Sequence, residues 1–552
     1  MKYQVQNQGT VSLTDQNFLA EGGEGKVYTI GGTAYKIYTN QPPPINKVQQ
    51  LQTLSHKSIV NPQALVYDAR NNYVGFSMRY VKDTLALCRL FVTDFLNRNN
   101  ITPKQLTELV GQMREVFEYI HANRMLVVDA NENNFLIREG EWTTPYFIDV
   151  LNWQTDQFPA NAIMPSIQDH HTKGFNVNTD WFSFAVLTCQ LYTGIHPYKG
   201  FHDDYKRNDF LGRMKDNVSI FNPKVRLPSV VRDFALIPNN LLDWYKAVLE
   251  KGERSAPPVA FDGPKPVVLK PTTQSITSQN FNIQLVGKFD QELERIVQAN
   301  AQTAYFLRNN VVFNRINYPK KEIFFGINST YWIEGNQEKI SFYNLKGEPA
   351  MSLPINHKAM LVVDNTIYVV ADQRLSQLAI YEGQQDRVMV KQNWPLLPGS
   401  TNVYDNMLII NALGKKVMVL LDEKRATVSL VSELDGGKVV NAKYLNHVAI
   451  VVTEKKGVLS KHIIRWKADF SSYTIWNFDN VSTADINFTV LDNGISVCIA
   501  EDGLMQVFNN NPEAKQIKEI HDQQILSKMR LTKYNSRIHF VVDNQLYSLS
   551  MR

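Results

Sequence analysis

Residues 121–136 read HANRMLVVDANENNFL, and residues 145–149 read PYFID. In the first stretch an apolar run ends at Asp129, with Asn134 five residues further on, and in the second an apolar strand ends at Asp149. Phosphoryl transfer needs a carboxylate near the attacking hydroxyl and further oxygen ligands for Mg²⁺. Two Asx turns beside strands are the alternative interpretation. The order of these residues and the gaps between them favour the phosphoryl-transfer interpretation.

A long amphipathic helix is predicted directly before the first stretch. Thr102 is a suitable N-cap residue, and Pro103 fits the first helical turn. Apolar residues then recur every three or four positions, which predicts one buried stripe on a helix of roughly twenty residues. The stripe consists of Leu106, Leu109, Val110, Met113, Val116, Phe117 and Ile120. The elements predicted before it are strands at 18–30, 32–39 and 73–81 and a helix at 45–55. A β-rich part followed by a larger helical part predicts a bilobal α+β domain.

The sequence AEGGEGKV at residues 20–27 lies between two strands of the predicted β-run at 18–30, and the next predicted strand carries Lys36. Glycines allow backbone N–H groups to approach phosphates, which a Cβ would obstruct. The P-loop spacing does not fit, because Val27 follows Gly-Lys where that motif needs Ser or Thr. Gly22, Gly25 and Val27 fit a glycine-rich loop that covers ATP, and Lys36 is placed to neutralise its phosphates. A simple glycine-rich hairpin turn is the alternative.

Residues from about 18 to 255 resemble the eukaryotic-like (Hanks-type) Ser/Thr protein kinases, and more narrowly a divergent bacterial branch whose members often carry accessory domains. The resemblance rests on KIY at 36–38, YVGFSM at 73–78, VDAN at 128–131, IDV at 148–150, TDWFSF at 179–184, LYTGIHP at 191–197 and GER at 252–254. It implies a kinase-like domain at about 1–255, with an N-lobe at about 1–80 and a C-lobe at about 81–255. It also implies ATP and Mg²⁺ as cofactors.

The resemblance assigns a role to each of the quoted polar residues. Asp129 is the catalytic carboxylate, assisted by Lys36, and Asp180 braces the loop of Asp129 from below. Asn134 and Asp149 hold Mg²⁺. The implied ATP contacts come from Gly22, Gly23, Gly25, Val27 and Lys36, from Met78 as the gatekeeper, and from the backbone of Tyr80 and Val81.

The chain departs from the family pattern in several places. The predicted helix at 45–55 contains no Glu to pair with Lys36, so a neutral partner has to come from Gln49, Gln50 or Gln52.

Further departures lie around Asp129. Val128 replaces the Arg that pairs with a phosphate on the activation segment, so we expect this switch to be lost. Asn131 replaces a Lys, and Val150 with Leu151 replaces Phe-Gly. The Pro-Glu anchor is assigned to residues 165–166, which leaves the Arg of GER at 252–254 without its usual acid.

Short β-runs that follow Asn or Asp turns recur from about residue 284 to the end. Asn turns mark five copies at steps of 41, 40, 47 and 42 residues, namely Asn365, Asn406, Asn446, Asn493 and Asn535. Further copies are assigned at 307–313 and 328–333. A period of roughly 40–50 residues is typical of β-propeller blades, which predicts six or seven of them. A strand at 281–286 is expected to complete the last sheet and close the ring. Two β-sandwiches in series are the alternative.

The composition narrows the class of protein. The chain has 552 residues, 44% of them hydrophobic and 20% charged, which excludes a mainly disordered or fibrous chain. No apolar stretch reaches the ~18 residues of a membrane helix, and the N-terminus does not look like a secretory signal. Three cysteines without a CxxC pair argue against a disulfide framework or zinc site and predict a reducing, cytoplasmic location. A net charge of +5 gives no strong nucleic-acid signal.

The expected organisation is a kinase-like domain at 1–255, a Pro-rich linker at 256–275 and an all-β propeller at 276–552. The expected function is that of an ATP- and Mg²⁺-dependent Ser/Thr protein kinase whose propeller recruits a protein substrate or docking partner. An active enzyme is favoured over a nucleotide-binding pseudokinase scaffold because all four key residues remain, namely Lys36, Asp129, Asn134 and Asp149. A kinase of small-molecule hydroxyls is a third possibility, because Asn131 replaces the Lys that protein kinases carry there.

Overall fold

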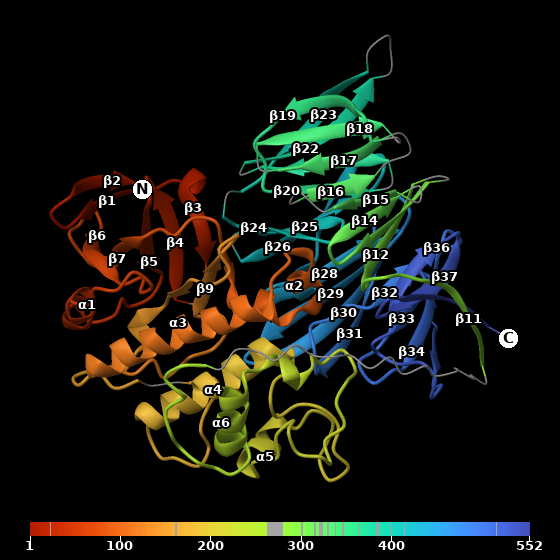
Figure 1. Ribbon diagram of the computed structural model, residues 1–552. Helices are drawn as coiled ribbons and strands as arrows, with labels where there is room; N and C mark the ends of the chain where they lie inside the picture. Colours follow the sequence, from red (N-terminus) through yellow and green to blue (C-terminus); the bar gives the residue numbers. More distant parts are fainter. Residues whose placement is uncertain are drawn as a thin grey trace. The chain divides into compact units, whose positions relative to one another are not determined.

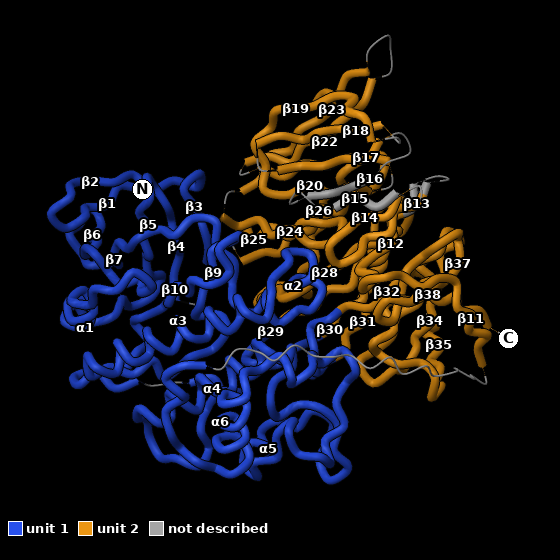
Figure 2. Tube along the Cα trace, viewed as in Figure 1, with its two compact units in different colours: residues 1–270, 454–460, 479–485 blue, residues 271–453, 461–478, 486–552 orange. Residues whose placement is uncertain are grey.

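The computed structural model describes residues 1–552 except 22–23, 161–162, 262–279, 300–301, 314–315, 320–323, 328–330, 337, 345–346, 364, 372, 382–385, 398, 413, 515 and 552. The described chain is mostly β-structure with few helices (Figure 1). It divides into two units, shown in Figure 2. The first unit contains 1–270 together with Glu454–Ser460 and Asp479–Asp485, and the second contains the rest.

A seven-stranded antiparallel sheet forms the N-terminal part of the first unit. Its strand order is β2-β1-β6-β7-β5-β4-β3. The strands are β1 (Lys2–Val5), β2 (Gly9–Ser12), β3 (Phe18–Glu21), β4 (Gly25–Ile30), β5 (Thr33–Tyr38), β6 (Pro62–Tyr67) and β7 (Tyr73–Arg79), with the helix α1 (Ile45–Gln52) between β5 and β6. A small sheet follows in the order β10-β9-β8, with the bounds β8 (Thr84–Ala86), β9 (Phe135–Arg138) and β10 (Pro145–Phe147).

Helices dominate the rest of the first unit. They are α2 (Thr93–Arg98), α3 (Pro103–Ala122), α4 (Val177–Thr193), α5 (Phe210–Lys215) and α6 (Asn239–Leu249). The long helix predicted from the apolar spacing is α3, and all seven residues of the predicted stripe are buried. Its predicted cap is also confirmed, because the Thr102 side chain accepts a hydrogen bond from the Gln105 N–H group.

The helix α4 is buried along almost its whole length, unlike a surface helix with one apolar stripe. It begins at the N-cap Asn176, whose side chain accepts from the N–H groups of Asn178 and Thr179. It ends at Gly194, which has a left-handed φ of +77°. A helix buried on all sides provides a fixed support for side chains that point from it toward the site.

The residues predicted to begin the linker pack against helices. Asn240 Nδ2 donates to the Ala260 carbonyl at 2.7 Å, and Trp244 Nε1 donates to the Ser255 carbonyl at 3.2 Å. The remainder of the predicted linker, residues 262–275, lies outside the described residues. The chain up to residue 261 therefore belongs with the helical part of the first unit.

Two segments from further along the chain complete the first unit. In Asp479–Asp485, the carbonyl of Asn480 accepts from Asn208 Nδ2 at 2.6 Å, and Asp485 Oδ1 accepts from the Thr93 N–H group at 3.1 Å. The second such segment, Glu454–Ser460, joins the strands β29 and β30.

Seven four-stranded antiparallel sheets make up the described strands after residue 280. Six of them use consecutive strands, and the seventh has the order β11-β38-β37-β36. The bounds are β11 (Phe281–Lys288), β12 (Leu293–Ala299), β13 (Gln302–Leu307), β14 (Asn310–Phe313), β15 (Ile316–Pro319), β16 (Phe324–Ile327), β17 (Tyr331–Gly335), β18 (Lys339–Asn344), β19 (Pro349–Pro354), β20 (Ala359–Val363), β21 (Thr366–Val370), β22 (Arg374–Tyr381), β23 (Arg387–Pro395), β24 (Thr401–Tyr404), β25 (Met407–Ala412), β26 (Lys415–Leu421), β27 (Ala426–Leu430), β28 (Lys438–Leu445), β29 (Val448–Lys455), β30 (Val458–Trp466), β31 (Tyr473–Val481), β32 (Phe488–Val490), β33 (Ile495–Ile499), β34 (Met505–Asn509), β35 (Ile517–Ile520), β36 (Arg530–Tyr534), β37 (Arg537–Val542) and β38 (Gln545–Met551).

Neighbouring sheets of the second unit pack against one another. Hydrophobic clusters join the sheet of β16–β19 to that of β20–β23, the latter to β24–β27, and this one to β28–β31. Another cluster joins the sheet of β32–β35 to the β36–β38 sheet. Leu293 and Leu307 of the sheet β12–β15 share a cluster with Val541 and Leu546 of the β36–β38 sheet. The strand pairing predicted between the start and end of this region is present, because Phe281 lies opposite Met551.

The Asn markers of the sequence repeat occupy one structural position. Each lies in a turn between two consecutive paired strands of one sheet, namely β20–β21, β24–β25, β28–β29, β32–β33 and β36–β37. Asn406, Asn446 and Asn535 have positive φ angles of 57°, 41° and 48°, which Asn tolerates better than most residues. In the predicted copy at 307–313, the turn joins β13 and β14, the second and third strands of their sheet. The turn predicted at 328–330 lies outside the described residues.

Two further expectations from the sequence concern disulfide bonds and membrane-spanning helices. Cys88, Cys189 and Cys498 are buried, and none of them forms a disulfide. Within the described parts of the chain, no helix combines the length and apolar character that a membrane crossing needs.

Candidate active site

Lys36 lies in β5, and its ammonium group is paired with two carboxylates. Its Nζ lies 3.0 Å from Oδ1 of Asp149 and 3.2 Å from Oε2 of Glu24, and the lysine side chain is only 12% exposed. Burial alone would lower the pKa of Lys36, but the carboxylates of Asp149 and Glu24 and the phenol group of Tyr38 raise it above its ordinary value. The lysine therefore stays a cation beside Asp149.

The predicted partners of Lys36 on α1 are wrong. Gln50 Oε1 accepts from the Thr155 hydroxyl at 2.8 Å, and Gln52 Nε2 donates to the Gln63 carbonyl at 3.1 Å. Gln49 is exposed. The carboxylate that the helix lacks is supplied by Glu24, from the loop between β3 and β4. The sequence does contain this carboxylate, because Glu24 belongs to the glycine-rich stretch. The direction of its side chain, however, cannot be derived from the spacing of the predicted strands.

Asp180 of α4 holds the loop that carries Asp129, which we call the Asp129 loop (residues 124–134). Its Oδ1 accepts from the Val128 N–H group and its Oδ2 from the Val127 N–H group, both at 2.8 Å. His121 Nε2 lies 2.9 Å from Oδ2, and Asp180 is completely buried. Val128 has a φ of +60°, an unfavourable conformation for a β-branched residue, so these bonds hold a strained turn. The bracing contact that the resemblance assigned to Asp180 is present.

Asp129 is half-buried, and both of its carboxylate oxygens accept hydrogen bonds. Oδ1 accepts from the Met164 N–H group at 3.0 Å, and Oδ2 accepts from Asn131 Nδ2 at 2.8 Å. The Asp129 carbonyl accepts from Asn134 Nδ2 at 2.8 Å. Burial raises the pKa of Asp129 above its ordinary value, against the opposing effect of the hydrogen-bond donors around it. Such a carboxylate is a better proton acceptor than one exposed to water.

Asn134 and Asp149 are brought together by the pairing of β9 with β10. Phe135 lies opposite Phe147 in this pair, so Asn134 and Asp149 flank the same end of it. The Ile148 N–H group donates to the Asn134 carbonyl at 3.0 Å, which ties the two chain segments together. Asp149 follows with a left-handed φ of +55°.

The oxygen donors at this end suit Mg²⁺. Carboxylate and amide oxygens are its preferred protein ligands, and it commonly binds one or two carboxylates and completes its shell with phosphate and water. The described residues include no group of three or more His, Cys, Asp or Glu side chains gathered for a metal. Asn134 and Asp149 provide one amide and one carboxylate group that could contribute to a magnesium site.

Gly25 and Val27 are the predicted ATP contacts of the glycine-rich stretch that the structure describes. A Cβ on Gly25 would lie 2.3 Å from the Ile37 carbonyl oxygen, so the close approach of β4 to β5 requires glycine here. Val27 lies opposite Lys36 in the same strand pair. Gly22 and Gly23, the other predicted contacts to ATP, lie outside the described residues.

The residues predicted to contact adenine lie at the end of β7. Met78 lies opposite Ala34 of β5 and packs against the cluster that contains Val81. The N–H group of Tyr80 donates to the Gly32 carbonyl at 3.0 Å. That donor is therefore engaged, and the Val81 carbonyl accepts a hydrogen bond from the Thr84 hydroxyl at 3.3 Å.

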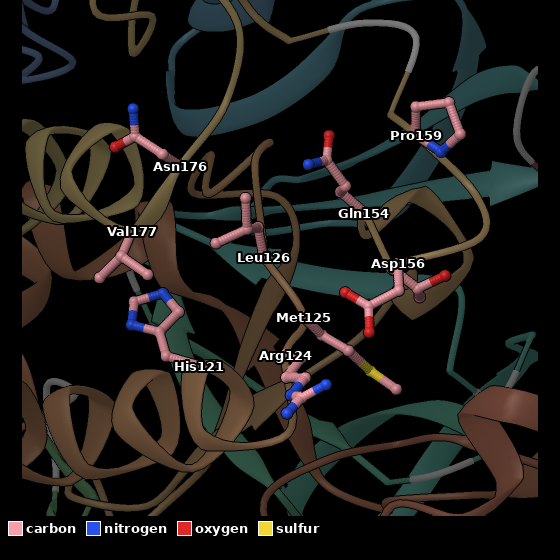
Figure 3. Close-up of a pocket in the computed structure, with 10 residues that line it drawn as sticks. His121, Arg124, Met125, Leu126, Gln154, Asp156, Pro159, Asn176 and Val177 are labelled. Carbon is pink, nitrogen blue, oxygen red and sulfur yellow. The ribbon is translucent and has the colours of Figure 1, made fainter.

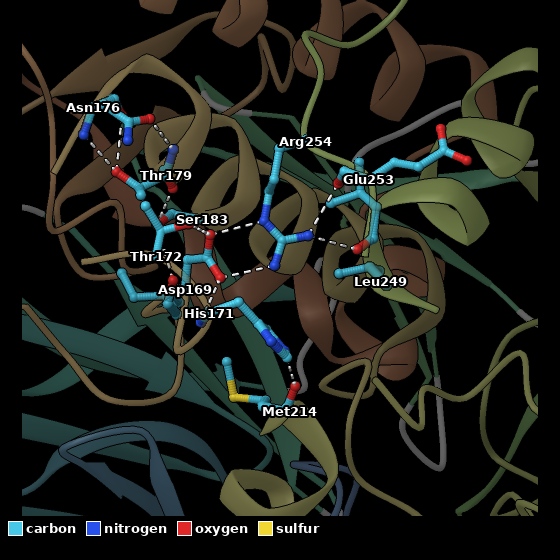
Figure 4. A network of polar contacts seen from close by, with 12 residues as sticks. Asp169, His171, Thr172, Asn176, Thr179, Ser183, Met214, Leu249, Glu253 and Arg254 are labelled. Carbon is cyan, nitrogen blue, oxygen red and sulfur yellow. Dashed lines mark hydrogen bonds and ion pairs between the residues drawn. The ribbon is translucent and has the colours of Figure 1, made fainter. Parts of the chain in front are cut away.

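The predicted anchor at 165–166 is wrong, because Asp169 takes that role. Arg254 donates from Nε to Oδ2 and from Nη2 to Oδ1 of Asp169, both at 2.7 Å, in the two-pronged arrangement of Figure 4. Asp169 lies in the chain between Asp149 and α4, which we call the Asp169 segment (residues 150–176). Its carboxylate also accepts from the hydroxyl of Thr172 at 2.7 Å. Arg254 therefore has an acid partner, displaced along the chain from the predicted position.

A cavity of about 610 Å³ is lined in part by residues 124–126 of the Asp129 loop (Figure 3). It is lined by the end of α3, by the Asp169 segment and by the start of α4. Its polar lining residues include His121, Arg124, Gln154, Asp156 and Asn176. None of the residues predicted to bind ATP or Mg²⁺ lines it, so this cavity is not the predicted nucleotide site.

A comparison with curated proteins shows a weak similarity to a viral protein. No protein-family model matches the chain. The chain is 20% identical over 200 residues to "Serine/threonine-protein kinase 1" of Heliothis zea nuclear polyhedrosis virus, a match that covers 34% of this chain and 74% of the viral protein. At this level of identity, the similarity indicates a distant relation to Ser/Thr protein kinases over about a third of the chain.

Proposed function

We propose that the chain is an ATP- and Mg²⁺-dependent kinase that phosphorylates Ser or Thr hydroxyls of proteins. The observation that carries this proposal is the ion pair between Lys36 and Asp149, whose charged atoms lie 3.0 Å apart although 113 residues separate them. A buried lysine beside a carboxylate, next to the Asp129 loop, is an arrangement suited to phosphate and a divalent cation. The weak similarity to a viral Ser/Thr protein kinase supports the same class of reaction.

Each of the four residues has a role in this proposal. Lys36 binds the phosphates of the nucleotide, and Asp149 with Asn134 holds Mg²⁺, which would neutralise the charge that develops on the transferred phosphate. Asp129 accepts the proton of the attacking hydroxyl, a task helped by the raised pKa of its carboxyl group. Asp180 keeps the Asp129 loop in its strained shape.

We further propose that the seven sheets form a closed seven-bladed propeller. The pairing of β11 with β38 and the cluster shared by the sheet of β12–β15 and the last sheet support ring closure. A propeller of this kind would bind a protein substrate or partner and raise the effective concentration of its hydroxyl at Asp129. The three buried thiols suit a reducing compartment such as the cytoplasm.

A pseudokinase that binds nucleotide without transferring phosphate is the second candidate. The observation that favours it is the pairing of Lys36 with Glu24, which places a carboxylate on the group assigned to the phosphates. Nucleotide binding would have to displace Glu24 from the lysine. In this alternative the chain acts as a nucleotide-dependent scaffold.

The experiment that separates these functions combines binding with transfer. The full chain is incubated with Mg²⁺ and γ-labelled ATP, together with either dephosphorylated casein or a small-molecule fraction of a cell lysate. Label on Ser or Thr of casein supports a protein kinase. Label found only in small molecules supports a kinase of small-molecule hydroxyls, the possibility suggested by Asn131. A rise in melting temperature with Mg²⁺-ATP but no transfer supports the pseudokinase. If the chain shows no nucleotide binding and no phosphate transfer, the assignment of Lys36 and Asp149 is contradicted.

A further inference from the structure

The turn Glu454–Ser460 contributes a buried carboxylate to the first unit. Glu454 is 4% exposed, and its Oε2 accepts from Asn133 Nδ2 at 2.8 Å across 321 residues of chain. Its Oε1 accepts from the Gly457 N–H group of its own turn. A buried carboxylate needs hydrogen-bond donors, and here they come from the turn and from the Asp129 loop. Glu454 therefore ties the turn to the loop that carries Asp129.

The same turn fits closely against the Asp169 segment. A Cβ on Gly457 would lie 2.3 Å from Oγ and 2.7 Å from Cβ of Ser166, and 3.4 Å from Sδ of Met164. Gly457 also has a left-handed φ of +76°, so both its conformation and its surroundings require glycine. Ser166 is only 3% exposed. The turn and residues 164–166 therefore leave no space between them for a side chain.

Met164, which lies under this turn, is also the residue that binds Asp129. Its N–H group donates to Asp129 Oδ1 at 3.0 Å. This hydrogen bond occupies one acceptor site of that carboxylate oxygen. It also places backbone atoms where an incoming hydroxyl has to approach this oxygen. The turn thus holds in place the Met164 N–H group, which is hydrogen-bonded to the Asp129 carboxylate.

We propose that the turn Glu454–Ser460 is a built-in restraint on the site, which clamps residues 164–166 over Asp129 and has to be released before a protein substrate reaches the carboxylate. The role of Asp129 in this inference rests on the proposed kinase function. The clamp itself is a property of the fold, so it can be tested without any catalysis.

The test compares hydrogen exchange and phosphate transfer in the full-length chain. Glu454→Gln weakens the bond to Asn133, and Gly457→Ala forces the turn away from Ser166. Lys455→Gln is the matched control, because Lys455 lies exposed on the same turn. We expect both test variants to exchange amide hydrogens in residues 163–170 about tenfold faster, the effect of losing one charge-assisted hydrogen bond. Transfer to casein should rise severalfold with an unchanged KM for ATP, while the control behaves as the wild type.

A second substitution, at Ser166, tests whether the effect of Gly457→Ala comes from its contact with that residue. Ser166→Gly removes the side chain that an alanine at position 457 would meet but not the backbone strain at that position, so the double variant Gly457→Ala/Ser166→Gly should exchange more slowly than Gly457→Ala alone. Unchanged exchange in Glu454→Gln and Gly457→Ala would overturn the inference. Faster exchange with slower transfer would also overturn it, because the turn would then support the active geometry. Faster exchange with no transfer in any variant would uphold the clamp and contradict the kinase function.

Discussion

The Asp129 loop and the Asp169 segment are each held by a buried aspartate, but the two aspartates use different partners. Asp180 accepts N–H groups from the backbone of the Asp129 loop and contacts His121. Asp169 instead binds the guanidinium of Arg254 through two hydrogen bonds. The loop is thus fixed by backbone dipoles, and the segment by an ion pair between side chains. The two regions should therefore respond differently to the loss of a single charge.

Replacing Arg254 with Met should have the largest effect on stability. The carboxylate of Asp169, whose side chain is 0% exposed, would keep only its bonds from Thr172 and from the His171 N–H group. Removing one partner of a buried ion pair costs about 3–5 kcal/mol, and urea denaturation of the full chain should show this loss in the free energy of unfolding. Adding Asp169→Asn should recover part of it, because no buried charge is then left unpaired. A loss below about 1 kcal/mol would contradict the anchoring role.

The same pair predicts a pH dependence. Burial acts to raise the pKa of Asp169, but the hydrogen bonds from Arg254, Thr172 and the His171 N–H group outweigh it and hold the pKa below its ordinary value. A lowered pKa contributes stability above the unfolded value, about 3.9, and this stability is lost as the pH falls through the folded value. The wild type should lose it in acid, and Arg254→Met should show a flatter dependence over the same range. Equal slopes in the two proteins would argue against this assignment.

Asp180→Asn should have a smaller effect on stability but a clear effect on transfer. The amide keeps one acceptor, so one of the N–H groups of Val127 and Val128 stays buried without a partner, at a cost of about 1–3 kcal/mol. The strained Asp129 loop should relax, and the transfer rate should fall. Asp209→Asn is the control, because Asp209 caps α5 by accepting from the Gly212 N–H group at 2.9 Å, and Asn caps equally well. Matching losses in both variants would show that Asp180 has no special role.

The pH dependence of transfer is a finer test of the Asp129 loop. Burial raises the pKa of Asp129, so the protonated, inactive form persists to higher pH than in an exposed aspartate. The acidic limb of kcat/KM, measured from pH 4 to 8, should lie above the ordinary Asp value of about 3.9. A limb at or below that value would show that Asp129 is not the group that titrates.

The smallest expected effect is that of phosphatase treatment. Val128 is buried and apolar where the resembled family has a cation, so position 128 provides no charge that could bind a phosphate. The hydroxyls of Thr155, Ser166 and Thr179 belong to buried residues. The rate of phosphate transfer by the treated protein should stay within about twofold of the untreated rate, because no phosphate bound at position 128 is needed to order the Asp169 segment. A collapse of the rate after treatment would show that the segment is switched by phosphorylation after all.

Features that depend on neighbouring residues were predictable from the sequence. The cap and apolar stripe of α3 follow from spacing within one helix, and the Asn turns follow from adjacent strands of one sheet. Partners across the fold were not predictable. Arg254 and Asp169 are 85 residues apart, and the acid lies a few positions beyond the predicted one, because the resemblance fixes the order of residues but not the path of a divergent segment. Glu24 was overlooked because strand spacing gives no side-chain direction.

Glu454 shows the same limit most strongly. Nothing near Glu454 in the sequence distinguishes it from other acids on strand ends, and its partner Asn133 lies 321 residues away. Only the fold places it beside the Asp129 loop. The residues of the site that the resemblance identified, Lys36, Asp129, Asn134 and Asp149, lie within three short stretches whose order along the chain carries the signal.

The initial rate of phosphate transfer in Asp129→Asn, measured with γ-labelled ATP and casein beside the wild type, tests the central claim most directly. The substitution keeps the size of the side chain and removes the proton acceptor. We predict a loss of about 10²–10⁴-fold in kcat, the usual contribution of a general base, with an unchanged affinity for Mg²⁺-ATP. A variant that transfers phosphate at the rate of the wild type would contradict the assignment of the reaction to Asp129.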